Sequence, residues 1–329
     1  MEVIVGLHNL KSRHLGCVLT IGNFDGVHYG HKMLLDHLVA KSDELDAPSM
    51  LLTFEPTPRE YFRGDAVPAR LTRFREKITL LQQTELDRVL CLPFDDRTAN
   101  TPAEWVIEEL LDRMLGVRYV VVGDDFRFGK GARGDYDMLK RAGDRYGFGV
   151  SLMGTLTFDH ERVSSSRIRE VLSAGDFPLA ERLLGHPYFI MGHVIYGRQL
   201  GRQLGVPTAN IPLHRYRAAL EGVYAVTVSG LDRPYYGIAN IGIRPTVDGK
   251  EPLLEVHLFD FEGDIYGQLL TVEFKLKIRD ERTFDGLDAL KAQIEKDIAT
   301  AREWFDNSNE DNANEDNANE DNANEADST

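Results

Sequence analysis

Short apolar runs alternate with amphipathic segments over the first 185 residues of the chain. Runs of about four or five apolar residues, rich in valine, are typical of strands that are buried on both faces of a sheet. They occupy residues 18–21, 50–54, 89–92, 119–122 and 150–153. Between them apolar positions recur at helical spacing, as from Trp105 to Leu115 behind the cap Thr101-Pro102. This alternation predicts the α/β class, with a Rossmann-like parallel sheet covered by helices.

A different pattern begins after Gly185-His186-Pro187, where strand-like segments follow one another with Gly and Pro in the gaps. These segments lie at residues 189–196, 224–229, 235–241, 253–259 and 269–278. Polar and apolar residues alternate from Glu255 to Phe259, which is typical of a half-buried antiparallel strand. A helix with Leu287, Ile294 and Ile298 on one face follows. The pattern predicts a domain over residues 1–184 and a small antiparallel β-barrel with a terminal helix over residues 185–305.

The last segment, residues 306–329, has a composition of its own. It repeats Asn-Glu-Asp-Asn-Ala and contains no aromatic residue, so we expect a disordered acidic tail without an assigned function. The formal net charge is −15, but nine acidic residues lie in this tail, so residues 1–305 carry −6. That balance argues against a general nucleic-acid or anionic-membrane binder, which needs a basic surface, but it leaves room for a small anionic ligand.

Neither a signal peptide nor an apolar run of roughly 18 residues, the length of a membrane helix, is found in the sequence. Cys17 and Cys91 are too few for a disulfide framework and are expected to be small core residues. We therefore expect a cytoplasmic enzyme that is a monomer or a weak homo-oligomer, with no nucleic-acid or membrane partner.

The stretch from Gly22 to His31 joins an apolar run to the start of a predicted helix. A glycine-rich turn allows close approach of a ligand, and a helix N-terminus attracts anions. His28 and His31 add two imidazoles at this point, so the stretch predicts a phosphate site. Capping histidines are the simpler interpretation; a zinc site is disfavoured because no third ligand stands at a characteristic spacing.

Three further stretches strengthen the phosphate interpretation. Thr53-Phe54-Glu55-Pro56-Thr57-Pro58 leaves the second strand in an extended, rigid conformation. Residues 122–130 combine two carboxylates, two aromatics and two cations in one loop, which suits a planar heteroaromatic ligand. Val163-Ser164-Ser165-Ser166-Arg167-Ile168-Arg169 places three hydroxyls and two guanidiniums at a predicted helix start. One serine would suffice for an N-cap, whereas the whole cluster can hold a triphosphate.

Residues 22–31, 53–58, 122–129 and 163–169 resemble the four motifs of the adenylyltransferase module in the bifunctional riboflavin kinase/FMN adenylyltransferase family, also called FAD synthetases. That module belongs to the His-x-Gly-His nucleotidyltransferases. The last motif usually reads Ile-Ser-Ser-Thr-x-Ile-Arg, and Val163 and Ser166 here retain its branching and its hydroxyl.

The second half resembles the riboflavin kinase module of the same family. A glycine-rich stretch from Gly192 to Gly205 leads into Pro207-Thr208-Ala209-Asn210, which is similar to the signature whose Thr and Asn help to bind Mg²⁺ and ATP. A glycine-rich loop alone indicates no more than a flexible turn. Glu255 resembles the catalytic glutamate of the family, although most strand glutamates are merely exposed.

The resemblance implies two sequential reactions: ATP phosphorylates riboflavin to FMN, and ATP then donates AMP to FMN, which gives FAD and pyrophosphate. It implies Mg²⁺ with ATP and no tightly bound prosthetic group. In the adenylyl-transfer site it implies ATP-binding by Gly22, Asn23, Phe24, Asp25, His28, His31, Ser165, Ser166 and Arg169. The catalytic residues among these are His28, His31 and Arg169.

For the kinase site the resemblance implies ATP-binding by Gly197, Gly205, Pro207, Thr208 and Asn210. Thr208 and Asn210 are the implied metal ligands, and Glu255 is the implied catalytic base. The implied flavin-binding residues are Pro56, Pro58, Asp125, Phe126, Arg127 and Arg279. Two alternatives stay open: a His-x-Gly-His nucleotidyltransferase that acts on another mononucleotide, and a non-catalytic flavin-binding protein.

Overall fold

The computed structural model describes residues 1–159, 161–197, 201, 205–246 and 249–326, without the side chains of 243–246, 249–251 and 309–326. The described chain forms two compact units. The first consists of Met1–Val171 and Pro178–His186, and the second of Leu172–Phe177 and Pro187–Thr329. Each unit has its own sheet, and each is described by itself below.

A six-stranded parallel sheet organises the first unit. Its strands are β1 (Glu2–Val5), β2 (Val18–Ile21), β3 (Ser49–Glu55), β4 (Arg88–Pro93), β5 (Tyr119–Gly123) and β6 (Gly149–Met153). Their order across the sheet is β1-β4-β3-β2-β5-β6, and all pairs are parallel. The connections from β2 lead to β3 and β4 on one side of the sheet, whereas the connection from β5 leads to β6 on the other side. The neighbours β2 and β5 therefore form the switch point of the sheet, where ligands bind in such folds.

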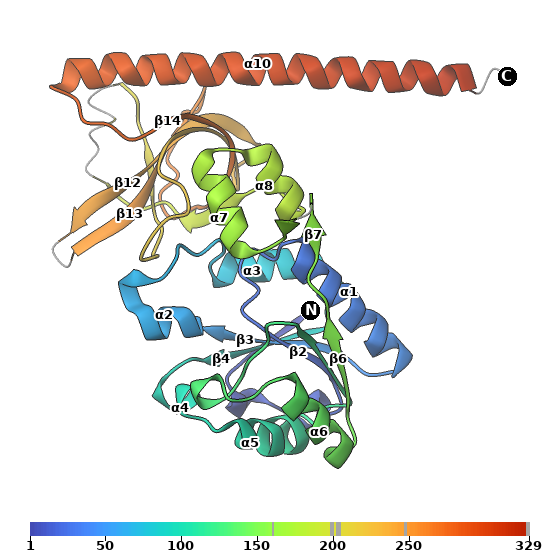
Figure 1. The fold of residues 1–329 in the computed structure, drawn as a ribbon. Coiled ribbons are helices and arrows are strands. Elements are labelled where there is room, and N and C mark those ends of the chain that lie inside the picture. Colours follow the sequence, from blue (N-terminus) through green and yellow to red (C-terminus); the bar gives the residue numbers. More distant parts are fainter. Residues whose placement is uncertain (160, 198–200, 202–204, 247–248, 327–329) are drawn as a thin grey trace. The chain divides into compact units, whose positions relative to one another are not determined.

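Helices cover both faces of this sheet (Figure 1). The longer ones are α1 (Tyr29–Glu44), α3 (Phe74–Leu81), α5 (Ala103–Trp105) continued by η4 (Val106–Met114), and α6 (Tyr136–Tyr146). Two more helices, α7 (Ser165–Ala174) and α8 (Phe177–Leu184), follow later in the chain and contribute residues to both units. Short ones are α2 (Pro58–Arg63), α4 (Asp96–Ala99), η1 (Leu7–Asn9), η2 (Ser12–His14), η3 (Gly64–Ala66) and η5 (Lys130–Ala132). The predicted helix after Thr101 is present, but η4 is a π-helix and Pro102 is the N-cap of α5.

One core lies between the sheet and the α5–η4–α6 layer. Leu19, Leu52 and Val120 of the sheet are at most 1% exposed and pack with Leu111 and Leu139 of that layer. The five strands predicted from the sequence are present within one residue at each end. The edge strand β1 was not predicted, and a small hairpin of β7 (Thr157–Phe158) and β8 (Glu161–Arg162) was not predicted either.

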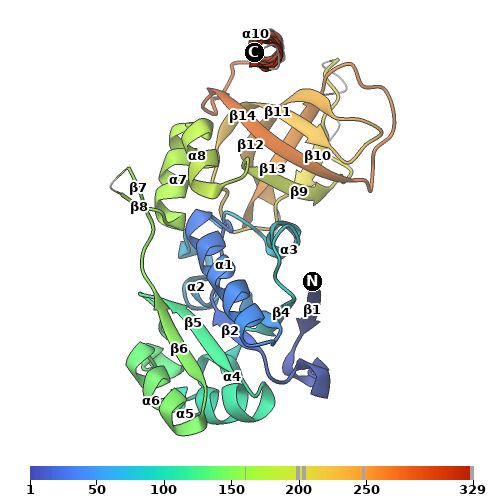
Figure 2. The same ribbon diagram turned by 90° about the vertical axis from the view of Figure 1, so that its right-hand side faces the viewer.

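The second unit is a nearly closed antiparallel barrel (Figure 2). Its strands are β9 (Phe189–His193), β10 (Ala209–Pro212), β11 (Gly222–Ser229), β12 (Tyr235–Thr246), β13 (Gly249–Leu258) and β14 (Leu269–Arg279). They follow the order β10-β13-β12-β11-β14-β9. The first and last strands meet where the backbone N–H of Ile195 donates to the carbonyl of Asn210 at 2.8 Å, so an isolated bridge closes the ring. The predicted antiparallel barrel is confirmed, with β10 as an additional strand.

The helix α10 (Leu287–Ala326) covers one side of this barrel. Its residues Ile294, Ile298 and Phe305 pack on Ala225 and Ile238 of the barrel. The helix is assigned as far as Ala326 and thus differs from the expectation of a disordered tail after residue 305. Within the described helices of the whole chain, none is both long and apolar enough to cross a membrane.

Candidate functional site

A cavity of about 1590 Å³ opens at the carboxyl edge of the parallel sheet. The residue at or just after the end of every strand contributes to its lining: Gly6, Gly22, Glu55, Phe94, Asp124 and Gly154. Pockets for one drug-sized ligand measure roughly 300–1,000 Å³, so this cavity has room for two ligands. Its position at the switch point between β2 and β5 agrees with the position expected from the sequence.

The His-x-Gly-His stretch stacks two imidazoles at the start of α1. The rings of His28 and His31 lie with centroids 3.7 Å apart and planes 15° apart. Phe24 stacks on His31 at 4.6 Å, which extends the stack to three rings. The turn that allows this arrangement has positive φ angles of 49° at Phe24 and 41° at Val27. Because residues with side chains rarely adopt this region, the turn is held by its surroundings, as is common at functional sites.

These two histidines are neutral in the free protein. Within the described residues, the Nδ1 atoms of His28 and His31 are buried and have no hydrogen-bond partner. Burial lowers the pKa of His28 to about 4, and nearby Asp25 offsets this only in part. Burial, together with the charges of His28 and Lys77, lowers the pKa of His31 well below its ordinary value. Each neutral ring carries one N–H donor, and both rings line the cavity, so they offer donors to an anion.

A buried ion pair joins the first and the last motif. Arg169 of α7 approaches the carboxylate of Asp25 with its Nη2 at 2.5 Å, and both side chains are about 15% exposed. The hydroxyl of Ser165 donates to the carbonyl of Asp25 at 3.0 Å. The other carboxylate oxygen of Asp25 accepts from the backbone N–H groups of Leu71 and Thr72, each at 3.0 Å. Asp25 thus acts as the junction that places Ser165 and Arg169 beside the histidine turn.

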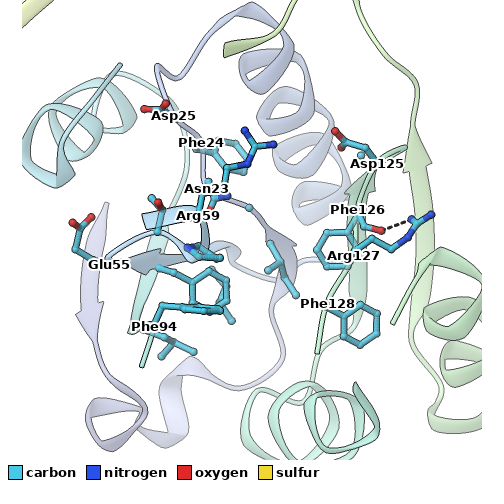
Figure 3. Close-up of a pocket in the computed structure, with 18 of the residues that line it drawn as sticks. Asn23, Phe24, Asp25, Glu55, Arg59, Phe94, Asp125, Phe126, Arg127 and Phe128 are labelled. Carbon is cyan, nitrogen blue, oxygen red and sulfur yellow. Dashed lines mark hydrogen bonds between the residues drawn. The ribbon is translucent and has the colours of Figure 1, made fainter. Parts of the chain in front are cut away.

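Aromatic and charged side chains form the opposite wall of the cavity. Figure 3 shows Asp125, Phe126, Arg127 and Phe128 across the cavity from Asp25. The rings of Phe126 and Phe128 are stacked with centroids 5.5 Å apart. Arg127 donates from Nη1 to the carbonyl of Phe126 at 2.7 Å. This wall offers flat apolar faces next to a cation, as the composition of the loop predicted.

The structure gathers nearly all residues predicted for this site. The residues of the set that line the cavity are Gly22, Asn23, Phe24, Asp25, His28, His31, Pro58, Asp125, Phe126, Arg127, Ser165, Ser166 and Arg169. Pro56 lies between Glu55 and Thr57, which both line the cavity, and is not itself part of the lining.

Among the lining residues that sequence reasoning missed, three carry an aromatic or cationic side chain near the start of α2 and the end of β4. Arg59 and Phe62 come from α2, and Phe94 follows β4. The rings of Phe62 and Phe94 meet edge to face with centroids 5.7 Å apart, although Phe62 is 67% exposed. Such an exposed phenylalanine indicates a binding surface. In the sequence Phe62 stands among mostly polar and charged residues, and Arg59 and Phe94 belong to none of the recognised motifs.

A buried charge network forms the floor beside the proline stretch. Arg70, 8% exposed, pairs with Glu55 at 2.7 Å and with Glu60 at 3.1 Å. Glu60 also accepts from the backbone N–H of Thr57 at 2.9 Å, which caps α2. The two carboxylates accept hydrogen bonds from the N–H groups of the Arg70 guanidinium. These bonds hold the segment that follows β3 in place.

A second site lies on the barrel of the other unit. Glu255 of β13 stands directly opposite Asn210 of β10 and directly opposite Asn240 of β12. Facing residues of an antiparallel pair project to the same side of the sheet with Cβ atoms about 4.5–5.5 Å apart. The register therefore places one carboxylate between two amides. Asn240 was not assigned a role from the sequence, because only strand pairing brings it next to Glu255.

Glycines create the space around Asn210 and Thr208. A Cβ atom at Gly197 would lie 2.4 Å from Nδ2 of Asn210, and one at Gly201 would lie 3.2 Å from Oγ1 of Thr208. Side chains at these positions would fill the space next to the two polar groups. A hydroxyl and an amide oxygen are hard donors of the kind that Mg²⁺ prefers, so the residues fit this ion. Residues 198–200 and 202–204 of the glycine-rich stretch lie outside the described residues.

The remaining predicted kinase residues lie at two places. Gly205 and Pro207 are exposed and immediately precede Thr208, and the carbonyl of Pro207 lies 2.9 Å from Nδ1 of His257. Arg279, at the end of β14, forms an ion pair with the buried Asp297 of α10 at 2.8 Å. This pair gives Arg279 a structural role, and its predicted flavin contact stays a prediction.

The two units and their sites define the class of protein, a two-domain transferase built around an α/β nucleotide site and a β-barrel. A family model described as FAD synthetase matches residues 10–167, and one described as riboflavin kinase matches residues 184–305. A relative from Haemophilus influenzae, named bifunctional riboflavin kinase/FMN adenylyltransferase, is 49% identical over 93% of this chain and 100% of its own length. A relative of the same name from Escherichia coli K12 is 49% identical over 93% of this chain and 98% of its own.

The chain belongs to the family of bifunctional riboflavin kinase/FMN adenylyltransferases. The predictions of the family and of a transferase with two activities are thereby confirmed. A crystal structure from Streptococcus pneumoniae, described as a macrolide-efflux protein, is also similar. It has a TM-score of 0.76 and 27% identity and covers 92% of this chain and 100% of that one.

Proposed function

We propose that residues 1–184 form the FMN adenylyltransferase domain and residues 185–305 the riboflavin kinase domain of a bifunctional enzyme. The barrel makes FMN from riboflavin and ATP, and the cavity of the α/β domain then makes FAD from FMN and a second ATP. The observation that carries the proposal is the pair of stacked, buried imidazoles, whose Nδ1 atoms have no hydrogen-bond partner among the described residues, in a cavity that is large enough for two ligands.

In the α/β domain, an oxygen of the FMN phosphate attacks the α-phosphorus of ATP. The new P–O bond joins the two phosphates, the bond from the α-phosphorus to the bridging oxygen breaks, and pyrophosphate leaves. A phosphate is already a competent nucleophile at neutral pH, so the site needs no strong base. Its task is to hold both phosphates and to stabilise the charge that moves to pyrophosphate.

The proposed ATP contacts divide this task. His28 and His31 donate hydrogen bonds to the phosphates at the N-terminus of α1, where the helix dipole favours negative charge. Ser165 and Arg169 approach from α7, oriented by Asp25. Because the guanidinium is already fixed by Asp25, its remaining N–H groups can meet an anion without a further loss of side-chain freedom.

The proposed FMN contacts come from the aromatic side of the cavity. Phe126 and the wall around it offer flat faces to the isoalloxazine ring, and Pro58 and Arg59 lie at the start of α2 on the same cavity. Aromatic faces contribute large apolar contact and prefer offset or edge-to-face arrangements with a flat ligand.

In the barrel, Glu255 accepts the proton of the ribityl 5′-hydroxyl while that oxygen attacks the γ-phosphorus of ATP, and ADP leaves. Asn210 and Asn240 stand opposite Glu255 on the two neighbouring strands, so their amides flank the carboxylate. Thr208 and Asn210 would hold Mg²⁺, which neutralises phosphate charge when it is bound. We further propose that the enzyme is cytoplasmic, needs no prosthetic group, binds no nucleic acid and is a monomer or a weak homo-oligomer.

The test is product analysis after incubation of the purified protein with riboflavin, ATP and Mg²⁺. Both FMN and FAD are expected; formation of neither would overturn the proposal. His28→Ala is expected to stop FAD formation while FMN accumulates. Glu255→Ala is expected to stop FMN formation but to leave FAD formation from supplied FMN intact. An unchanged kinase rate in Glu255→Ala would show that the assigned base is wrong.

Two alternatives are tested with the same protein. Replacing FMN by nicotinamide mononucleotide or phosphopantetheine reveals whether another acceptor is used faster, which would reassign the α/β site. Flavin binding without any turnover would indicate a non-catalytic flavin-binding protein. The barrel with its Thr208, Asn210 and Glu255 argues against both alternatives, because neither needs a kinase site.

A further inference from the structure

A buried lysine that forms no ion pair in the described part of the chain lies next to the adenylyl-transfer site. Lys77, in the middle of α3, is 0% exposed. Its ammonium donates to the hydroxyl of Thr53 at 3.3 Å. Within the described residues this is its one hydrogen bond, and it forms no ion pair there. An enclosed ammonium with a single neutral partner is costly, so it calls for an explanation.

The segment that carries Lys77 is fastened to the histidine turn. Thr72 accepts from the backbone N–H of Gly26 at 2.9 Å, and its own N–H donates to Asp25 at 3.0 Å. Glu76, 1% exposed, accepts from the backbone N–H of Arg73 at 2.6 Å and caps the start of α3. Lys77 therefore keeps a fixed position relative to the phosphate-binding turn.

The lysine reaches the sheet directly behind the cavity. Thr53 lies in β3 between Leu52 and Phe54, which both line the cavity. In the neighbouring strand β4 its register partner is Cys91, which also lines the cavity. The ammonium is thus enclosed next to residues that line the cavity, where the lower effective dielectric of the interior strengthens its interaction with a charged ligand.

Charged and titratable groups face Lys77 from each neighbouring segment. They are Asp25 after β2, His31 of α1, Glu55 at the end of β3, Arg70 before α3 and Cys91 of β4. Burial, with the help of Arg70, lowers the pKa of Lys77 to about 8, against the opposing effect of Asp25 and Glu55. The charge of Lys77 in turn lowers the pKa of His31.

We propose that Lys77 is a positioning residue for adenylyl transfer: its enclosed ammonium, held at Thr53 of β3 on a segment that is fastened to the histidine turn, supplies a fixed positive charge that favours the phosphates of ATP in the cavity. The proposal rests on the proposed function of the cavity. It explains why an ammonium that forms no ion pair within the described residues is retained in an enclosed position, because the phosphates of the nucleotide add to the two carboxylates, Asp25 and Glu55, that already favour its charge.

The test compares Lys77→Met with the wild type in pyrophosphate release from ATP and FMN. Methionine has a similar length and carries no charge. We expect kcat/KM for ATP to fall at least tenfold at pH 7, with KM for FMN within twofold of the wild type. The dependence of kcat/KM on pH gives the distinguishing readout. In the wild type kcat/KM falls as pH rises through about 8, because Lys77 loses its proton. Lys77→Met lacks this fall, which is called the alkaline limb below.

Thr53→Val provides a second variant that retains the lysine. Loss of the single hydrogen bond to the ammonium lowers the pKa of Lys77 further, so the alkaline limb moves to lower pH. Lys140→Met, an exposed lysine on α6, is the matched control for loss of one charge. Riboflavin phosphorylation by the barrel, measured in the same preparations, reports whether each variant is folded.

A folded Lys77→Met that retains kcat/KM for ATP within twofold would overturn the proposal. If Lys77→Met does not fold, the pH profiles decide: a flat wild-type profile from about pH 6.5 to 9.5, or an unshifted limb in Thr53→Val, overturns it. Failure of the wild type to form FAD from FMN would instead contradict the proposed function of the cavity, so the two failures are distinguishable.

Discussion

Arg169 and Asp25, 144 residues apart in the chain, form a 2.5 Å ion pair at the edge of the adenylyl-transfer cavity. The other carboxylate oxygen of Asp25 accepts hydrogen bonds from the backbone N–H groups of Leu71 and Thr72. One carboxylate thus holds three separate segments in place: the histidine turn, the segment before α3 and the start of α7. The pair explains why motifs that are distant in sequence act as one site.

We predict that Asp25→Ala destabilises the protein by about 1–3 kcal/mol, because it leaves a largely buried guanidinium without its carboxylate partner. FAD formation should fall at least tenfold, since Arg169 loses its orientation. Thermal unfolding and FAD formation from supplied FMN measure both effects. The control is Glu109→Ala, which removes the partner of the exposed Arg113 and should change neither by much. Equal effects of the two substitutions would contradict this account of Asp25.

The histidine pair predicts a dependence of stability on pH. Because burial lowers the pKa of His28 to about 4, the unfolded chain binds a proton at this residue between about pH 6.5 and 4, whereas the folded chain does not. Stability at this site is therefore full above pH 6.5 and is lost as pH falls, by up to about 1.4 kcal/mol per pH unit and histidine. His28→Asn should show a shallower loss between pH 7 and 5 in urea unfolding. An unchanged slope would mean that His28 is not held neutral.

A substitution at Gly197 tests the kinase site without replacing any of its polar residues. A Cβ at this position meets the Asn210 amide at 2.4–2.6 Å, so Gly197→Ala must displace that amide. We expect riboflavin phosphorylation to fall at least tenfold and FAD formation from supplied FMN to stay unchanged. Gly286→Ala is the matched control, because no atom lies within 4 Å of a Cβ there. Comparable kinase rates in the two variants would refute the role given to Asn210.

The Arg279–Asp297 pair predicts that the end of β14 depends on α10. Asp297 is 2% exposed and also accepts from Gln293 at 2.7 Å. Removal of either partner of such a pair should cost about 3–5 kcal/mol. In a double-mutant cycle of Arg279→Ala and Asp297→Ala, the double variant should lose less than the sum of the two single losses. Additive losses, together with a raised KM for riboflavin only in Arg279→Ala, would favour the flavin contact predicted from the sequence.

Some features could be read from local sequence because their causes are local. The buried parallel strands can be recognised in the sequence as continuous apolar runs. The predicted run at residues 18–21 has the same bounds as β2. The turn from Gly22 to His31 was recognisable because glycines and the two histidines stand close together in the chain. By contrast, the edge strand β1 contains an apolar run of only three residues, Val3-Ile4-Val5, in which Val3 and Val5 are 37% and 53% exposed. So short a run does not by itself indicate a buried strand.

The tertiary structure alone decided which distant groups meet. Strand register places Asn240 beside Glu255, and no local pattern encodes a partner on another strand. Packing of α3 against the sheet turns Lys77, which reads as an ordinary surface lysine, into a fully enclosed cation. The sequence by itself determined the two folds, the family motifs and the phosphate chemistry, because periodicity and short motifs act over a few residues. The electrostatic state of the site was decided by folding, since burial and charge proximity depend on contacts between segments far apart in the chain.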